Sequence, residues 1–319
     1  MTTVALIIPV HNEEACIDAL LGEMSTVCAK LVNKFSIQFR AVFVDDGSSD
    51  NTCARIEQNK LSNIPITLIR FSRNFGKESA LTAGLSEAAE DDAVIIMDAD
   101  LQHPLEMIET FIERWQQEQV DVVYAYKESR RSEGIFMRIF STIFYRLLNY
   151  SNRYEIPKNA GDFRLISQPV VRAILSMPEN ERFMKGLYSW VGFQQLGIAY
   201  TPNQRKFGKT TFSKSALIAL SIDGLTSFSI APLRLMSIVG FLISLLSAFY
   251  FAYVVFERLF LTTAIPGLAS VFALVSLFGG VQLICLGIIG EYVGKILMES
   301  KRRPTYVISK VQRFGNDVD

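Results

Sequence analysis

The chain has 319 residues, of which 50% are hydrophobic, and its 32 Lys and Arg balance its 32 Asp and Glu. This composition excludes a disordered chain, and the lack of a basic excess argues against a nucleic-acid-binding protein. The mean hydropathy of +0.24 indicates that part of the chain lies in lipid. Four cysteines without a CxxC pair and only two histidines argue against a zinc centre and favour a reducing compartment.

Short apolar runs alternate with helical patterns in the first two thirds of the chain. The runs predicted as buried strands are residues 4–10, 39–44, 66–71, 93–97 and 120–126. Apolar residues repeat at helical spacing over 17–31 and 81–88. This alternation predicts an α/β domain with a mostly parallel sheet, in which ligands bind beyond the carboxyl ends of the strands.

Four successive predicted strand ends carry acidic or amide side chains. They are HNEE after the first strand, DDGSSD after the second, RNFGK after the third and DADLQH after the fourth. A single cluster fits a helix cap equally well, as Asn12 or Ser49-Asp50 would serve. Four clusters at one edge of one sheet are better explained by a ligand site.

Asp98-Ala99-Asp100 is the sharpest of these clusters. Residues two apart in an extended segment point to the same side, so both carboxylates can face one cation. Together with the Gln102 amide oxygen, they form a hard-oxygen set that suits Mg²⁺ or Mn²⁺ bound to substrate phosphates. The sequence contains no GxGxxG and no GxxxxGK[ST], so a dinucleotide oxidoreductase and a P-loop kinase have no support.

Two long uncharged stretches follow, residues 235–256 and 259–290. Pro266-Gly267 marks a turn in the second stretch, so two transmembrane helices are predicted, with the alternative of buried core helices. Basic residues flank the pair at Arg234 and at Lys295 to Arg303, which places both chain ends in the cytoplasm. No signal peptide is expected at the amino terminus.

An amphipathic stretch, residues 134–150, presents one apolar face beside several arginines. It predicts either a helix in the membrane interface or an ordinary helix that packs on the sheet. Residues 215–230 are a second interfacial candidate. The predicted organisation is a cytoplasmic domain (1–214), an interfacial helix (215–232), a two-helix transmembrane hairpin (233–294) and a cytoplasmic basic tail (295–319). The spacings Gly287–Gly290 and Gly290–Gly294 are compatible with helix packing, including packing in a homo-oligomer.

The motifs IPVHNEE, VDDGSSDNT, SRNFGKESAL and DADLQHP, in this order, resemble the inverting family-2 glycosyltransferases of the GT-A fold. The segments AGDFRLIS, ERFMKGLYSWVGF and LGIIGEYVGKI…KRRPTYVI resemble the polyprenyl-phosphate branch of that family. Within it, the chain is similar to the bactoprenol (undecaprenyl-phosphate) glucosyltransferases of O-antigen serotype conversion. The resemblance covers nearly the whole chain.

The resemblance implies roles for individual residues. The nucleotide-sugar pocket would comprise Pro9, Asn12, Glu14, Asp46, Lys77 and Asp98. The metal site would comprise Asp98, Asp100 and Gln102, Asp162 would be the catalytic carboxylate, and Arg130, Arg138 and Arg205 would hold the acceptor phosphate. The family pattern G-x-[ST]-K after Arg205 is here Gly208-Lys209-Thr210-Thr211, which leaves the phosphate contact of this loop open.

The implied reaction is inverting transfer of glucose from UDP-glucose to undecaprenyl phosphate at the bacterial inner membrane, for modification of O-antigen or lipopolysaccharide. The acceptor phosphate is largely dianionic at neutral pH, so Asp162 is either a general base or an orienting residue. Alternatives are another sugar (GlcNAc, galactose or aminoarabinose), a non-catalytic membrane scaffold, and a processive synthase, which would carry a QxxRW motif that is absent here.

Overall fold

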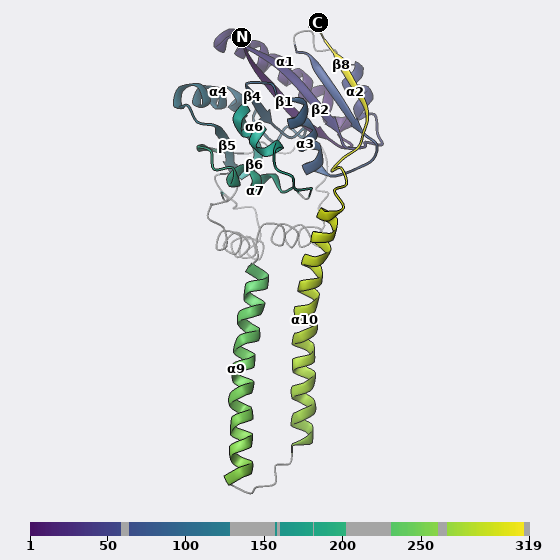
Figure 1. Ribbon diagram of the computed structural model, residues 1–319. Helices are drawn as coiled ribbons and strands as arrows, with labels where there is room; N and C mark the ends of the chain where they lie inside the picture. Colours follow the sequence, from purple (N-terminus) through teal and green to yellow (C-terminus); the bar gives the residue numbers. More distant parts are fainter. Residues whose placement is uncertain are drawn as a thin grey trace.

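The computed structural model describes residues 1–58, 64–127, 157, 160–180, 182–201, 231–260 and 267–315. They form an α/β domain from which two long helices, α9 (Ala231–Phe260) and α10 (Leu268–Ser300), extend side by side (Figure 1). The interfacial candidates at 134–150 and 215–230 lie outside the described residues, and so does the loop at 208–211.

The elements of the domain alternate as the sequence predicts, and all five predicted strands are confirmed with ends shifted by a few residues. The first half comprises β1 (Thr2–Val10), α1 (Glu14–Phe35), β2 (Ile37–Asp45), α2 (Thr52–Gln58), β3 (Ile66–Phe71), α3 (Lys77–Glu87), β4 (Ala93–Ile96), α4 (Met107–Glu118) and β5 (Val122–Lys127). The second half comprises β6 (Ala160–Ser167), α6 (Gln168–Leu175), α7 (Met184–Trp190), β7 (Gln195–Tyr200) and, after α10, β8 (Ile308–Phe314).

The described strands form one eight-stranded sheet in the order β7-β5-β6-β4-β1-β2-β3-β8. Strands β4, β1, β2 and β3 are parallel, so their carboxyl ends meet at one edge. Strand β6 runs antiparallel to β4, with Ile96 paired to Arg164. Continuing this register by two residues brings Asp98 opposite Asp162, at the same edge of the sheet.

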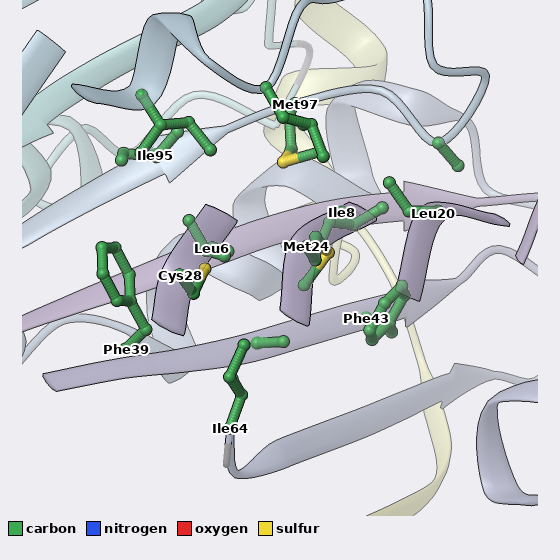
Figure 2. Close-up of a cluster of buried hydrophobic side chains, with 14 of the residues drawn as sticks. Leu6, Ile8, Leu20, Met24, Cys28, Phe39, Phe43, Ile64, Ile95 and Met97 are labelled. Atoms are coloured by element: carbon green, nitrogen blue, oxygen red, sulfur yellow. The ribbon is translucent and has the colours of Figure 1, made fainter. Parts of the chain in front are cut away.

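Helices cover both faces of the sheet. Alternate residues of β1 point to opposite faces, so Leu6 and Ile8 pack against Leu20 and Met24 of α1 (Figure 2). On the other face, Ala5 and Ile7 of β1 belong to a second apolar cluster with residues of α3, α6 and α7. The strands of the parallel block are therefore buried on both sides, which explains their nearly continuous apolar sequences.

Both long helices expose large apolar side chains along their length, including Phe241, Leu246, Leu283 and Ile284. Among the described residues, one stretch is long and apolar enough to span a bilayer, Leu277–Ser300 in α10, and none of it is buried in the protein. The apolar stretch of α9, Met236–Tyr250, is shorter. Beyond α10 the chain turns back to the domain, where β8 pairs antiparallel with β3 and forms the edge of the sheet (Figure 1).

Candidate active site

The candidate site lies at the edge of the sheet where the parallel strands end. The loops after β1, β2, β3 and β4 meet there, and the antiparallel strand β6 begins there. Asp162 lies in this first part of β6. The sheet topology therefore gathers side chains that are far apart in the sequence.

Lys77, the first residue of α3, links two carboxylates. Its Nζ lies 2.5 Å from Asp98 Oδ1 and 2.8 Å from Asp162 Oδ2. The Asp162 side chain is only 14% exposed, whereas those of Lys77 and Asp98 are 42% and 33% exposed. Burial opposes the ionisation of Asp162, but the positive charges of Lys77, Lys185 and Arg164 outweigh it and hold its pKa well below the usual range. Asp162 is therefore a carboxylate, and this edge of the sheet accommodates a cation.

The three residues predicted for a metal site follow β4 in one tight turn. The Gln102 N–H donates to Asp100 Oδ1 at 3.1 Å. Leu101 between them is buried and has φ 56°, a left-handed conformation that is uncommon for a side chain other than Gly, Asn or Asp. Backbone strain of this kind is often found at functional sites.

The buried side chain of His103 contacts the backbone of this turn. Its Nδ1 accepts the Asp98 N–H at 3.4 Å, and its ring stacks on Phe163 with centroids 4.7 Å apart. Burial lowers the pKa of His103, so the imidazole is neutral at pH 7. His103 therefore acts as a local hydrogen-bond acceptor for the backbone of this turn.

Among the described residues, no group of three or more His, Cys, Asp or Glu side chains is arranged to hold a metal ion. Two carboxylates and an amide still fit Mg²⁺ or Mn²⁺, because these ions commonly take one or two carboxylates and complete their shell with water and substrate phosphates. The Lys77 ammonium beside Asp98 shows that a positive charge is stabilised at this position. The donor set therefore fits a divalent ion that is shared with a substrate.

Asp46, predicted for the nucleotide pocket, fastens the loop after β2 to the loop after β3. Its Oδ1 accepts the Phe75 N–H at 2.6 Å and its Oδ2 accepts the Gly76 N–H at 2.9 Å. Gly47 lies so close to the second loop that a Cβ there would be 2.6 Å from the Arg73 carbonyl carbon, and its φ is 71°. Only glycine satisfies both conditions. Phe75 and Gly76 thus bind Asp46 through their backbone amides. The next residue, Lys77, binds Asp98 and Asp162 through its ammonium group.

Asn12 and Glu14 connect the first strand end to the second. Asn12 Oδ1 accepts the Ser49 N–H at 2.8 Å, and the Glu14 carboxylate accepts the N–H and side-chain amide of Asn51. Pro9 lies inside β1, paired with Val44. Asn12 therefore does not cap α1, because it binds an amide of the neighbouring loop. The cap interpretation holds for Asp50, which accepts the N–H of Thr52, the first residue of α2, at 3.0 Å.

Three residues near Asp162 were not predicted as site residues: Glu78, Arg164 and Tyr188. Glu78 accepts the backbone N–H of Met184, the first residue of α7, at 3.0 Å. Burial and the nearby charge of Asp162 raise the pKa of Glu78 to about 7. Arg164 is 2% exposed, donates to the Gly161 carbonyl, and lies 3.8 Å from the centre of the Tyr188 ring. The motifs SRNFGKESAL, AGDFRLIS and ERFMKGLYSWVGF contain these residues, but their roles arise from antiparallel pairing and helix packing, which the motifs alone do not reveal.

The three arginines predicted for the acceptor phosphate, Arg130, Arg138 and Arg205, lie outside the described residues. Within the described part of the chain, the positive charges around Asp162 are Lys77, Lys185 and Arg164.

Residues 5–175 match the model of the family described as glycosyl transferase family 2. This match covers more than half of the chain, including strand β6 and the loops after β1, β2, β3 and β4. The chain belongs to glycosyl transferase family 2. Its α/β fold, with the mostly parallel sheet, is GT-A-like, as the sequence motifs predict.

Full-length relatives of this family 2 glycosyltransferase are known. It is 39% identical over 305 residues to an uncharacterized glycosyltransferase of Synechocystis, covering 96% of this chain and 94% of the relative. It is 37% identical to a prophage bactoprenol glucosyl transferase homolog of Escherichia coli (97% and 99% covered) and 39% identical to a bactoprenol glucosyl transferase of Shigella phage SfII (98% and 99% covered). Such coverage includes both long helices.

Among solved structures, the chain is similar to glucosyl-3-phosphoglycerate synthase of Mycobacterium tuberculosis, solved with Mn²⁺, UDP-glucose and phosphoglyceric acid. The two are 16% identical, with a TM-score of 0.48, and the match covers 71% of this chain and 78% of that one.

Proposed function

We propose that this family 2 glycosyltransferase transfers a glucosyl group from UDP-glucose to the phosphate of undecaprenyl (bactoprenol) phosphate, with inversion. The observation that carries the proposal is the meeting of Asp98 and Asp162 at Lys77, which gathers a donor-side and an acceptor-side carboxylate at the binding edge of the sheet. Relatives of matching length in Escherichia coli and Shigella phage SfII that are named bactoprenol glucosyl transferases support the choice of sugar and acceptor.

On the donor side, Asp98, Asp100 and Gln102 would hold Mg²⁺ or Mn²⁺ against the diphosphate of the nucleotide sugar. When bound, the ion supplies Lewis-acid stabilisation of the diphosphate leaving group. Pro9, Asn12, Glu14 and Asp46 would border the nucleoside. Each Asp46 oxygen already accepts one amide N–H, and each keeps a lone pair for a ligand.

On the acceptor side, Asp162 would orient the groups of the site rather than remove a proton from the acceptor phosphate. A phosphate monoester with a second pKa near 6 is largely dianionic at pH 7, so it needs little help from a base. A carboxylate whose pKa is held low by Lys77, Lys185 and Arg164 is also a weak base. Lys77 would then keep Asp162 and Asp98 at a fixed separation while donor and acceptor approach, and Arg130, Arg138 and Arg205 would neutralise the acceptor phosphate.

The acceptor's lipid tail requires a site near a bilayer, and the two long helices support this location. We propose that α9 and α10 form a two-span hairpin in the bacterial inner membrane, with the family 2 domain on the cytoplasmic side. The exposed apolar side chains on both helices, the spanning stretch Leu277–Ser300 and the basic residues that follow α10 support this arrangement. Within the predicted basic tail, residues 295–319, strand β8 pairs with β3 of the domain.

The deciding experiment is transfer by the full-length enzyme in detergent, with undecaprenyl phosphate and a panel of UDP-glucose, UDP-galactose, UDP-GlcNAc and UDP-aminoarabinose. Mass spectrometry of the lipid fraction should show a hexose added only from UDP-glucose. Addition of another sugar would support the proposed transfer to the lipid phosphate and would identify a different nucleotide sugar as the donor. No lipid-linked product with any donor, from enzyme that still binds UDP, would overturn the proposed acceptor.

A further inference from the structure

The segment between α10 and β8, residues 301–307, returns from the long helices to the catalytic domain. At its start, Glu299 in the last turn of α10 accepts the Asn180 backbone N–H through both carboxylate oxygens, at 3.0 and 3.1 Å. Asn180 lies in the connection between α6 and α7. The end of α10 is thus joined to the loop that leads into α7, close to the candidate site.

Residues 305–307 then bind both ends of the loop that follows β3. The Val307 carbonyl accepts the Ser72 N–H at 3.0 Å, and the Thr305 carbonyl accepts the Ser79 hydroxyl at 3.1 Å. Ser72 begins this loop and Ser79 lies in the first turn of α3, just beyond it. The returning segment therefore spans the loop from one end to the other.

Tyr306 supports the same loop through its ring. It stacks on Phe71, with centroids 5.0 Å apart and an angle of 12° between the rings. Phe71 in turn meets Phe75 edge-on, with centroids 5.7 Å apart. The Phe75 N–H donates to Asp46, so three aromatic rings connect the end of the chain to a carboxylate of the predicted nucleotide pocket.

The supported loop carries the contacts on which the candidate site depends. Its Phe75 and Gly76 amides hold Asp46, and the next residue, Lys77, holds Asp98 and Asp162. A change in the position of this loop would therefore move the donor-side and the acceptor-side carboxylates together. The loop also contacts the first two strand ends, through Asn74 Nδ2 with His11 Nε2 at 3.3 Å and through the close approach of Gly47 to Arg73. Ser72, Arg73 and Asn74 are exposed, so Tyr306 and Phe71 provide the apolar support of this loop.

We propose that Tyr306 is a positioning residue for nucleotide binding: it holds residues 72–76 in the conformation that presents the Phe75 and Gly76 amides to Asp46 and Lys77 to Asp98. This role rests on the proposed function for the nucleotide, although the effect on the loop itself does not. It also gives a function to the motif KRRPTYVI, whose tyrosine is Tyr306. The segment after α10 is then part of the donor site rather than a tail.

The simpler explanation is that the segment and β8 together only cover the edge of β3 and stabilise the sheet. The two explanations differ for a variant that weakens β8 without touching the loop. Val311 pairs with Ile69 inside β3, five residues beyond Tyr306, and is 41% exposed. Val311→Ala is therefore the matched control, since it weakens a strand of the same segment and leaves the aromatic stack intact.

The test compares the wild type with Tyr306→Ala, Tyr306→Phe, Tyr306→Leu and Val311→Ala as full-length proteins in detergent. Two quantities are measured: the Kd of UDP in the presence of Mn²⁺, and the hydrogen-exchange rate of the peptide that contains the Phe75 and Gly76 amides. Loss of one aromatic stacking contact should raise both about fivefold in Tyr306→Ala. Tyr306→Phe keeps the stack and should stay within about twofold of the wild type.

Val311→Ala should lower the thermal unfolding midpoint while Kd and exchange at 72–77 stay at wild-type values. Equal effects of Val311→Ala and Tyr306→Ala, or unchanged exchange in Tyr306→Ala, would overturn the proposal. If Tyr306→Ala does not fold, Tyr306→Leu, which keeps apolar bulk without a stacking face, decides by its exchange rate. A wild type that fails to bind UDP would count against the proposed function, and the exchange rates would still decide the role of Tyr306.

Discussion

Lys77 Nζ lies 2.8 Å from Asp162 Oδ2, so the first residue of α3 compensates the charge of a carboxylate that is only 14% exposed. Lys77→Met should leave Asp162 without its nearest cation and destabilise the protein by about 1–2 kcal/mol. This value is below the usual cost of breaking a fully buried pair, because the Lys77 side chain is 42% exposed and water screens part of the interaction. Urea denaturation followed by Trp115 and Trp190 fluorescence measures the change.

Lys30→Met is the matched control for Lys77→Met. Lys30 forms an ion pair of the same length, 2.8 Å, with Glu109, but its side chain is 67% exposed. Its removal should leave the denaturation midpoint unchanged. An equal loss in both variants would show that the position of Lys77 has no special energetic role.

The pH dependence of stability should also change in Lys77→Met. The pKa of Asp162 is lowered in the folded state, so its contribution is present above its unfolded pKa, about 3.9, and is lost as pH falls below that value. Without Lys77 this contribution shrinks. The wild type should therefore lose more stability than Lys77→Met between pH 5 and pH 3.

Asp100→Asn tests the proposed metal site. The variant keeps the size of the side chain but loses a charged oxygen, and transfer should fall by at least about 100-fold, as expected when a metal-held leaving group loses its stabilisation. EDTA should stop the wild-type enzyme, and Mg²⁺ or Mn²⁺ should restore it. Full activity in a rigorously metal-free preparation would falsify the site.

Asp162→Asn separates the two roles of the catalytic carboxylate. If Asp162 orients the site through Lys77, the loss of kcat should be nearly constant from pH 5.5 to 8, because the missing interaction is geometric. If Asp162 is a general base, activity should return as the pH passes the second phosphate pKa, about 6, because the acceptor then ionises without help. Recovery to near the wild-type rate by pH 8 would reject the orienting role.

Glu78→Gln should make stability less sensitive to pH. Burial raises the pKa of Glu78 to about 7, so the folded protein is most favoured below its unfolded pKa, about 4.3, and loses stability as pH rises through 7. Gln cannot ionise, yet its oxygen can still accept the Met184 N–H. The unfolding midpoint of the variant should match the wild type at pH 5 and exceed it at pH 8.

Glu87→Gln, at the other end of α3, is the control for Glu78→Gln. Glu87 forms ion pairs with Arg40 and Arg313 at 3.6 and 3.0 Å. Its neutralisation should lower the unfolding midpoint or leave it unchanged at pH 8. A gain in both variants would point to the net charge of the protein rather than to the burial of Glu78.

The proposed topology can be measured directly. A reporter fused after Asp319 should be cytoplasmic, and a cysteine introduced at Thr262 or Thr263 should react with a membrane-impermeant reagent from outside the cell. The basic residues that flank the proposed hairpin motivate this expectation. External labelling of the carboxyl terminus would reject the hairpin and the cytoplasmic location of the domain.

The sequence predicts the parallel half of the fold well, because strands β1 to β4 are buried on both faces and read as short apolar runs between turn motifs. This pattern predicts which edge of the sheet carries the site and which residues follow each strand at that edge. The antiparallel strand β6 was recognised only as the motif AGDFRLIS, and polar residues at Asp162 and Arg164 interrupt its apolar pattern. The pairing of Asp162 with Lys77 could not be predicted, since it depends on the register between β4 and β6.

Strand β8 was missed for a different reason. Its sequence, ISKVQRF, mixes charged and apolar residues without a regular alternation, because four of its seven positions are exposed in succession and it lies at the edge of the sheet. Edge strands often carry charged residues, which discourage further pairing. The tail therefore reads as a basic, solvent-exposed segment, although Lys310 and Arg313 belong to the sheet.

The position of β8 in the chain also determines when, during translation, the sheet can be completed. Its partner, β3, is synthesised more than 230 residues earlier, as the Ser309–Arg70 contact shows. During translation β3 therefore has an open edge until both long helices have been completed, and such edges are prone to pair with other chains. A ribosome that stops anywhere before residue 308 releases a product whose sheet is unfinished. The cell thus obtains a catalytic domain with β3 covered only from chains that have been translated through β8.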